Sequence, residues 1–87
     1  MTSHDLRQYM ADIPVHDHQG LLDYLFLHIP TGGFLRAVLS NDLKEACLHA
    51  DDENRYALWN IVAFLCNHAP SDAWGSAEKY TAWMERK

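Results

Sequence analysis

With 87 residues, the chain has room for one hydrophobic core and no second domain. A composition of 48% hydrophobic and 22% charged residues excludes the apolar-poor profile of disorder and predicts a folded globular domain. Twelve acidic against seven basic residues give a formal net charge of -5, and the basic residues are scattered. This argues against a dedicated nucleic-acid binder, which needs a basic patch to neutralise phosphates.

The two cysteines, Cys47 and Cys66, form no CxxC pair, so neither a zinc knuckle nor a redox motif is predicted. Both fall in segments that favour helix, and we expect them to be buried free thiols in a reduced, intracellular protein. No stretch resembles a signal peptide, and no apolar run approaches the roughly 18 residues of a membrane span. The expected location is the cytoplasm, without contact to a membrane.

Residues 1–15 predict a short helix that ends before Pro14 and that docks only loosely on the rest of the domain. Thr2 followed by Asp5 resembles a capping box at its start. Apolar residues recur in this segment at the spacing of one helix face: Leu6, Tyr9, Met10 and Ile13.

A second helix is predicted to start near Asp17 or His18 and to end at Pro30, because a proline disfavours the α conformation of the residue before it. Its apolar face would carry Leu21, Leu22, Leu25, Phe26 and Ile29. His16, Asp17 and His18 are residue types that bind metals, but a metal site needs further ligands at a typical spacing. We interpret them as a polar helix start with Asp17 as its cap, and predict neither a metal nor a cofactor.

Thr31-Gly32-Gly33 predicts a tight turn, in which Thr31 caps a helix that begins at Phe34. The polar residues 40–42 (SND) interrupt the apolar stripe that follows, so the segment forms either one kinked helix or two short ones. Arg36 is the only charged residue of residues 34–39. It is open to three interpretations: a solvent-facing residue, the partner of a carboxylate, or a contact to another chain.

Residues 52–68 predict the central helix of the domain. Asp51, Asp52 and Glu53 stand at its start, where the unpaired N–H groups and the helix dipole favour negative charge. These three residues also form the only acidic run and are a candidate interaction surface. Apolar residues wrap most of the helix, so we expect neighbours to cover it on several sides; they are Tyr56, Ala57, Leu58, Trp59, Ile61, Val62, Ala63, Phe64, Leu65 and Cys66.

Pro70 ends this helix, and Ser76 is a predicted cap for a last helix. The inner face of that helix would carry Tyr80, Trp83 and Met84. Trp74 lies in the loop between the two helices and either seals the end of the bundle or anchors a partner, because tryptophan is enriched among interface hot spots. No segment alternates as a strand does. The prediction is one all-α domain, a compact bundle of four to six short helices around helix 52–68.

The sequence predicts no catalytic site. The serines Ser40, Ser71 and Ser76 stand at predicted caps or turns, and no G-x-S-x-G elbow is present. The cysteines fall on predicted apolar faces, and no base is evidently paired with either of them to activate a thiolate. We therefore expect a non-enzymatic protein.

Four stretches carry a likeness to a known group of proteins: residues 28–39 (HIPTGGFLRAVL), 41–43 (NDL), 50–55 (ADDENR) and 74–79 (WGSAEK). Over roughly residues 21–83, the chain resembles a family of short proteins encoded by bacteriophages and prophages. The resemblance implies no activity and no catalytic residue. It implies a binding role, because small acidic phage proteins often bind and disable host machinery, including defence complexes.

The expected function is thus a protein–protein interaction module that modulates or inhibits a host protein. Its candidate contact residues are Arg36 and Trp74 together with the acidic run 51–53. The alternative is a small DNA-binding regulator with a basic face made by Arg36, Lys44 and Arg55. Both hypotheses leave the oligomeric state open, with a homo-oligomer as one alternative.

Overall fold

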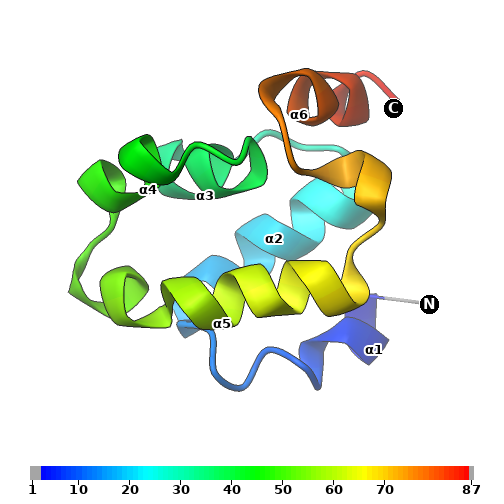
Figure 1. Ribbon diagram of the computed structural model, residues 1–87. Helices are drawn as coiled ribbons and strands as arrows, with labels where there is room; N and C mark the ends of the chain where they lie inside the picture. The colour runs from blue at the N-terminus through cyan, green and yellow to red at the C-terminus, as the bar shows by residue number, and fades with distance from the viewer. Residues whose placement is uncertain (1–2, 87) are drawn as a thin grey trace.

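The computed structural model describes residues 3–86, which form six α-helices and a short 3-10 turn (Figure 1). No strand occurs among these residues, so the all-α prediction is confirmed. The proposed cap Thr2 lies outside the described residues. The elements are α1 (Ser3–Arg7), α2 (Val15–Leu27), α3 (Gly33–Leu39), α4 (Leu43–His49), α5 (Asp52–His68), the 3-10 turn (Ser71–Ala73) and α6 (Ala77–Met84).

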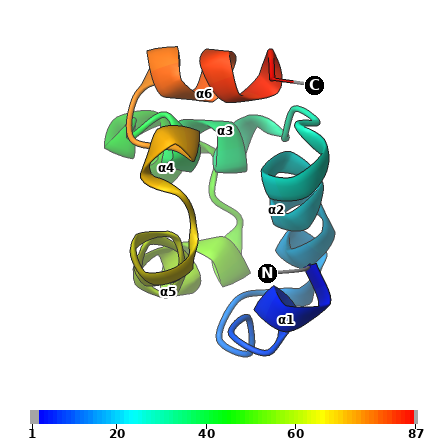
Figure 2. The same ribbon diagram turned by 90° about the vertical axis from the view of Figure 1, so that its right-hand side faces the viewer.

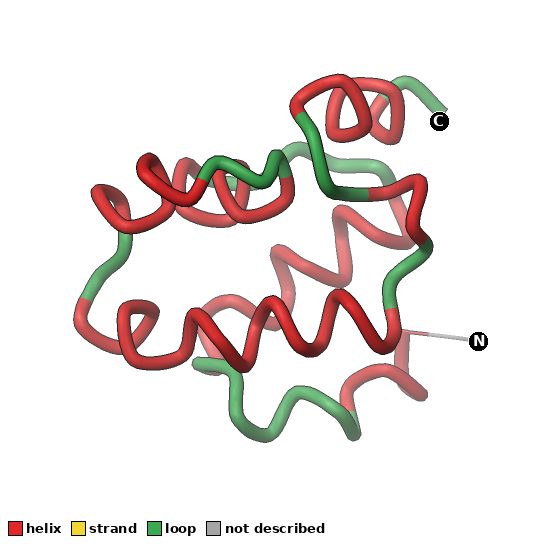
Figure 3. The backbone as a smooth tube through the Cα atoms, in the orientation of Figure 1, coloured by secondary structure: helices red, strands yellow, loops and turns green. Residues whose placement is uncertain are grey.

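The helices surround one interior. Figures 1 and 2 show α2 and α5 on opposite sides of it, with α3 and α4 above them, α6 on top and α1 below. The connections are short loops (Figure 3). The most completely buried large side chains come from both walls, from α3 and from the segment after α1: Met10, Leu21, Leu22, Tyr24, Leu39, Ile61 and Leu65. Burying a side chain of this size contributes about 1.5–3 kcal/mol relative to leaving it exposed.

Three helix starts follow the capping rules, and of these caps Ser76 is the predicted one. The side chains of Asp42, Asp51 and Ser76 each accept a hydrogen bond from the backbone N–H three residues later, at 3.2, 2.8 and 3.1 Å. The interrupted segment resolves into two short helices, because Asn41 adopts a left-handed conformation with φ 59° between α3 and α4.

Helix α2 differs from its prediction at both ends. It begins at Val15, directly after Pro14, and Asp17 is not its cap but is buried in its first turn. It ends at Leu27 because His28, with φ 57°, turns the chain in a left-handed C-cap. Phe26 and Ile29, predicted to lie on the apolar face, are 37% and 42% exposed, so this part of the prediction was wrong.

Helix α3 is capped by Gly32, with no side-chain hydrogen bond, and not by Thr31 as predicted. The Thr31 side chain instead lies 3.2 Å from the Tyr80 hydroxyl, and the Thr31 backbone N–H donates to that hydroxyl at 2.9 Å. Thr31 therefore joins the turn before α3 to α6.

The segment that contains α1 contributes to the core. Leu6, Met10 and Ile13 are buried, whereas the ring of Tyr9 stacks on His68 with 4.0 Å between the ring centroids. At the other end of the chain, the inner face of α6 is as predicted: Tyr80 and Trp83 are buried, and Met84 packs partly buried against the core.

Both cysteines are exposed, so the prediction of buried thiols was wrong. Cys47 lies on α4, where only Ala46 is buried. Cys66 lies on α5 but faces outward, because the buried residues Ile61, Phe64 and Leu65 occupy the opposite side of the helix.

Candidate protein-binding surface

Helix α5 forms one wall of the core and leaves its outer face uncovered. Tyr56 and Trp59 are 86% and 80% exposed, so the expectation that neighbours cover this helix on several sides was wrong. A domain of this size has too few elements to pack against both faces of its longest helix. Because residues three apart are neighbours on a helix surface, the two aromatic rings share one face.

This outer face carries no charge over three turns. Residues 56–67 contain no Asp, Glu, Lys or Arg. Single exposed apolar side chains are common on soluble proteins, whereas two adjacent exposed aromatic rings on an uncharged helix face are typical of contact surfaces, whose centres are depleted of charge and enriched in Tyr and Trp. We call the face that Tyr56 and Trp59 form the aromatic face of α5.

A shallow groove that is largely open to solvent lies beside the aromatic face, between α5 and the loop that joins α1 to α2. Its volume is about 450 Å³. The amide of Asn60 donates a hydrogen bond of 3.3 Å to the carbonyl of Asp12, which holds the loop against the helix. The residues that line the groove are Ala11, Asp12, Ile13, Pro14, Val15, Glu53, Tyr56, Ala57 and Asn60.

The lining of the groove combines apolar residues with two acidic ones. Ile13 and Ala57 are buried, and Val15 is 79% exposed. Asp12 lines the groove from the loop and Glu53 lines it from the helix. Neither carboxylate has an ion-pair partner among the described residues.

The three acidic residues at the start of α5 differ in their contacts. Asp51 caps the helix and also lies 3.1 Å from the ring nitrogen Nε2 of His16. Asp52 lies 3.6 Å from the guanidinium of Arg55. Glu53 alone of the three lines the groove with an unpaired carboxylate, so it is the one acidic candidate that the structure joins to the aromatic face.

Arg36 and Trp74 lie elsewhere. The Arg36 guanidinium is exposed and stands 5.7 Å from the centroid of the Tyr80 ring. Trp74 is partly buried, packs against the core and lines a hollow of about 60 Å³ with Leu58 and Val62, which favours the sealing interpretation. Arg36, Glu53 and Trp74 line three different hollows, and the structure does not bring them into one surface.

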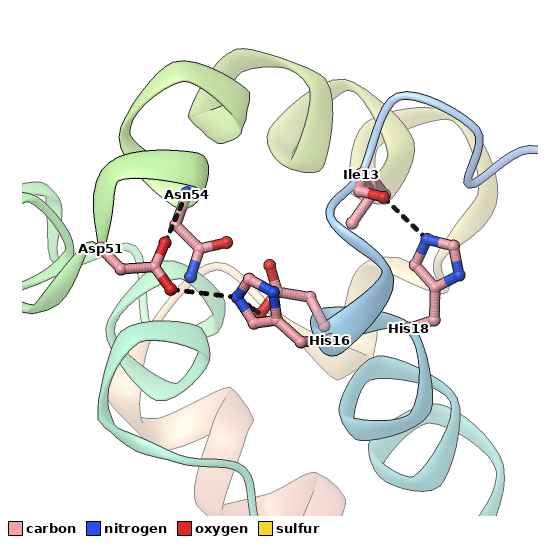
Figure 4. A network of polar contacts seen from close by, with 6 residues as sticks. Ile13, His16, His18, Asp51 and Asn54 are labelled. Carbon is pink, nitrogen blue, oxygen red and sulfur yellow. Dashed lines mark hydrogen bonds and ion pairs between the residues drawn. The ribbon is translucent and has the colours of Figure 1, made fainter.

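A polar contact links the starts of α2 and α5 (Figure 4). His16 approaches both Asp51 and, at 3.7 Å, Asp17. The ring of His18 is instead hydrogen-bonded to the carbonyl of Ile13 at 2.8 Å, so the two histidines of the sequence motif point to different partners. In the part of the chain that the structure describes, no group of three or more His, Cys, Asp or Glu is arranged to hold a metal ion.

Asp17 and Asn54 are the buried polar residues of the described chain, at 5% and 4% exposure. Asp17 Oδ2 and Asn54 Oδ1 accept no hydrogen bond from the described residues. Burial raises the pKa of the Asp17 carboxyl above its ordinary value, although His16 and a hydrogen bond from Asn54 act in the opposite direction. Asp17 and Asn54 are therefore not an accessible site. Burying their unsatisfied oxygens lowers the free energy of unfolding.

Sequence reasoning missed the residues that make this surface. Tyr56 and Trp59 were assigned to the covered part of the central helix, and Asp12 and Val15 were not singled out. The one signal that the sequence offers is the apolar circumference of α5 in a chain of 87 residues, since so small a domain cannot cover such a helix completely.

No helix within residues 3–86 is long and apolar enough to cross a membrane. Comparison with protein-family models, with curated proteins and with solved structures finds no match to this chain. The function must therefore be argued from the surface itself.

Proposed function

We propose that this protein is a non-enzymatic protein–protein interaction module and that the aromatic face of α5 is its contact surface. The observation that carries the proposal is the exposure of Tyr56 and Trp59 at neighbouring positions of α5, at the start of residues 56–67, which contain no charged residue. Burying two aromatic side chains of this kind removes about 150–250 Å² each from water, so such a pair is able to dominate the energy of an interface.

The proposed partner is a host protein or defence complex, and the proposed setting is the cytoplasm of a bacterial cell that carries a phage or prophage. This part of the proposal is supported by the resemblance of residues 28–39, 41–43, 50–55 and 74–79 to phage-encoded proteins, and by the small size and negative charge of the chain. The alternative of a DNA-binding regulator has less support, because Arg36 lies over Tyr80 and Arg55 is paired with Asp52.

The test is affinity purification of the tagged protein from a bacterial host lysate, with and without nuclease treatment, followed by mass spectrometry. Three forms are compared: the wild type, Tyr56→Ala/Trp59→Ala, and the control Leu27→Ala/Leu48→Ala. The control also removes two exposed apolar side chains, 59% and 69% exposed, but from α2 and α4.

We expect a stoichiometric protein partner with the wild type and the control, and its loss with Tyr56→Ala/Trp59→Ala. Equal recovery by all three forms would exclude the aromatic face as the contact surface. Recovery only without nuclease would favour the regulator, and the absence of any partner above background would count against an interaction module.

A further inference from the structure

The groove beside the aromatic face has the lining of a site for a long cationic side chain. Its lining includes the buried residues Ile13 and Ala57 together with Asp12 and Glu53, whose carboxylates have no ion-pair partner among the described residues. Arginine and lysine place their aliphatic stems against apolar surface and their charged heads toward polar groups. A purely apolar ligand would leave both carboxylates desolvated without a counter-charge, at a cost in binding free energy.

We propose that this groove binds an arginine side chain of a basic segment of the partner protein, and that an apolar residue beside that arginine covers Tyr56 and Trp59. The inference rests on the proposed function, because it names the chemistry of the partner that the aromatic face would bind. The chain's formal charge of -5 adds a long-range attraction for such a segment.

Two features favour arginine over lysine. The guanidinium is planar and presents donors in several directions, so it is able to reach carboxylates on both walls of the groove. It also stacks well on an aromatic ring, and the exposed ring of Tyr56 forms one edge of the groove. The protein already contains such contacts, since the guanidinium of Arg86 lies 4.9 Å from the Trp83 ring centroid.

At the start of α5, Asp51 and Asp52 already have partners within the chain, so the groove is where a cation meets acidic residues without such partners. Asp51 is engaged by His16 and by the N–H of Asn54, and Asp52 by Arg55. A basic residue of the partner that approached these two carboxylates would have to compete with contacts within the chain. At the groove, Asp12 accepts a hydrogen bond from Asn60 through its backbone carbonyl, and its side chain has no hydrogen bond or ion pair to the described residues.

The probe for the test is the peptide Ala-Leu-Arg-Leu-Ala, blocked at both ends, titrated into the ¹⁵N-labelled full chain and followed by NMR. The matched peptide replaces arginine by citrulline, which keeps the shape but removes the charge. The variant Asp12→Asn/Glu53→Gln removes both groove carboxylates. The control Glu78→Gln/Glu85→Gln removes the same net charge from α6 and its C-terminal cap.

We expect the arginine peptide to shift the amide signals of residues 11–15, 53, 56 and 60 in the wild type and in the control. In Asp12→Asn/Glu53→Gln we expect binding weaker by about 2-fold to 30-fold, the range for the loss of two exposed ion pairs. The citrulline peptide should bind the wild type more weakly by a similar factor, and added salt should reduce the difference.

Equal binding of both peptides, or equal weakening in both double variants, would overturn the arginine site and leave only non-specific charge attraction. The amide signals of α5 could instead broaden with protein concentration and not respond to the peptide. This result would show that a second copy of the chain covers the aromatic face, and it would also overturn the arginine site. If Asp12→Asn/Glu53→Gln retains the partner in the affinity purification while Tyr56→Ala/Trp59→Ala loses it, the interaction module stands and the arginine site fails.

Discussion

The ring nitrogen Nε2 of His16 lies 3.1 Å from Asp51 Oδ2 and thereby connects the first turn of α2 to the N-cap of α5. The other carboxylate oxygen of Asp51 accepts the backbone N–H of Asn54 at 2.8 Å. One carboxylate thus caps the helix that carries the aromatic face and ties this helix to the opposite wall of the core.

The dual role of Asp51 predicts a clear loss of stability when it is replaced. We expect Asp51→Ala to lower the free energy of unfolding by about 1–2 kcal/mol, since an N-cap alone contributes about 0.5–2 kcal/mol. The control is Asp52→Ala, which removes a carboxylate that only approaches Arg55 on the surface and should change stability by about 0.5 kcal/mol or less. Urea denaturation followed by circular dichroism measures both, and equal effects would contradict the capping role.

The buried carboxylate of Asp17 predicts a dependence of stability on pH. Because burial raises the pKa of Asp17 in the folded state above its ordinary value of 3.8, the folded state holds the proton more tightly than the unfolded state. The contribution of Asp17 to stability is therefore fully present below about pH 3.8 and is lost as pH rises through the folded-state pKa.

Asp17→Asn should consequently stabilise the protein at neutral pH, by on the order of 1 kcal/mol, because it removes a buried charge with an unsatisfied oxygen. The gain should shrink as the pH is lowered through the folded-state pKa of Asp17. Urea denaturation at a series of pH values tests this, with the exposed Asp52→Asn as the control. A gain that is the same at acidic and neutral pH would show that the carboxylate charge is not its cause.

Local sequence signals predicted the helices well, because the interactions that start and end them are local. Asp42, Asp51 and Ser76 each cap a helix through the N–H three residues along the chain, and this spacing is visible in the sequence. Helix 52–68 was predicted with the bounds that the structure has. The prediction of Asp17 as the cap of α2 from the same local signals was wrong, because this side chain is buried next to Asn54 of α5.

The candidate surface was harder to predict, because exposure depends on which other elements exist to cover a helix. The pattern of α5 identifies its apolar residues but does not say which of them meet α2. Ile61 is completely buried and Trp59 is 80% exposed, although they lie two positions apart on one helix. The groove exists only because the loop that contains Asp12 lies against α5. The spacing of residues in the sequence does not determine the position of that loop.

The hydroxyl of Tyr24 joins α2 to the 3-10 turn and predicts a second loss of stability. It donates a buried hydrogen bond of 2.5 Å to the carbonyl of Ala73, and burial raises its pKa above the usual range, so it remains a neutral donor. Tyr24→Phe leaves that carbonyl without this partner and should cost about 1–3 kcal/mol. The control Tyr56→Phe alters a hydroxyl on a side chain that is 86% exposed and should leave the urea midpoint unchanged. Equal midpoints for the two variants would exclude a structural role of the Tyr24 hydroxyl.

The aromatic face should be dispensable for folding, which separates binding from stability. Trp59→Ala removes a side chain that the fold hardly contacts, and we expect a change in the free energy of unfolding within about 0.5 kcal/mol. Ile61→Ala, on the inner face of the same helix, should cost about 2–5 kcal/mol, because it opens a cavity in the core. Thermal and urea denaturation of the two variants provide the comparison. If Trp59→Ala lowered the free energy of unfolding as much as Ile61→Ala, the Trp59 ring would be covered in solution, either by the chain itself or by a second copy. A dependence of the Trp59→Ala effect on protein concentration would identify the second copy, because association stabilises by mass action.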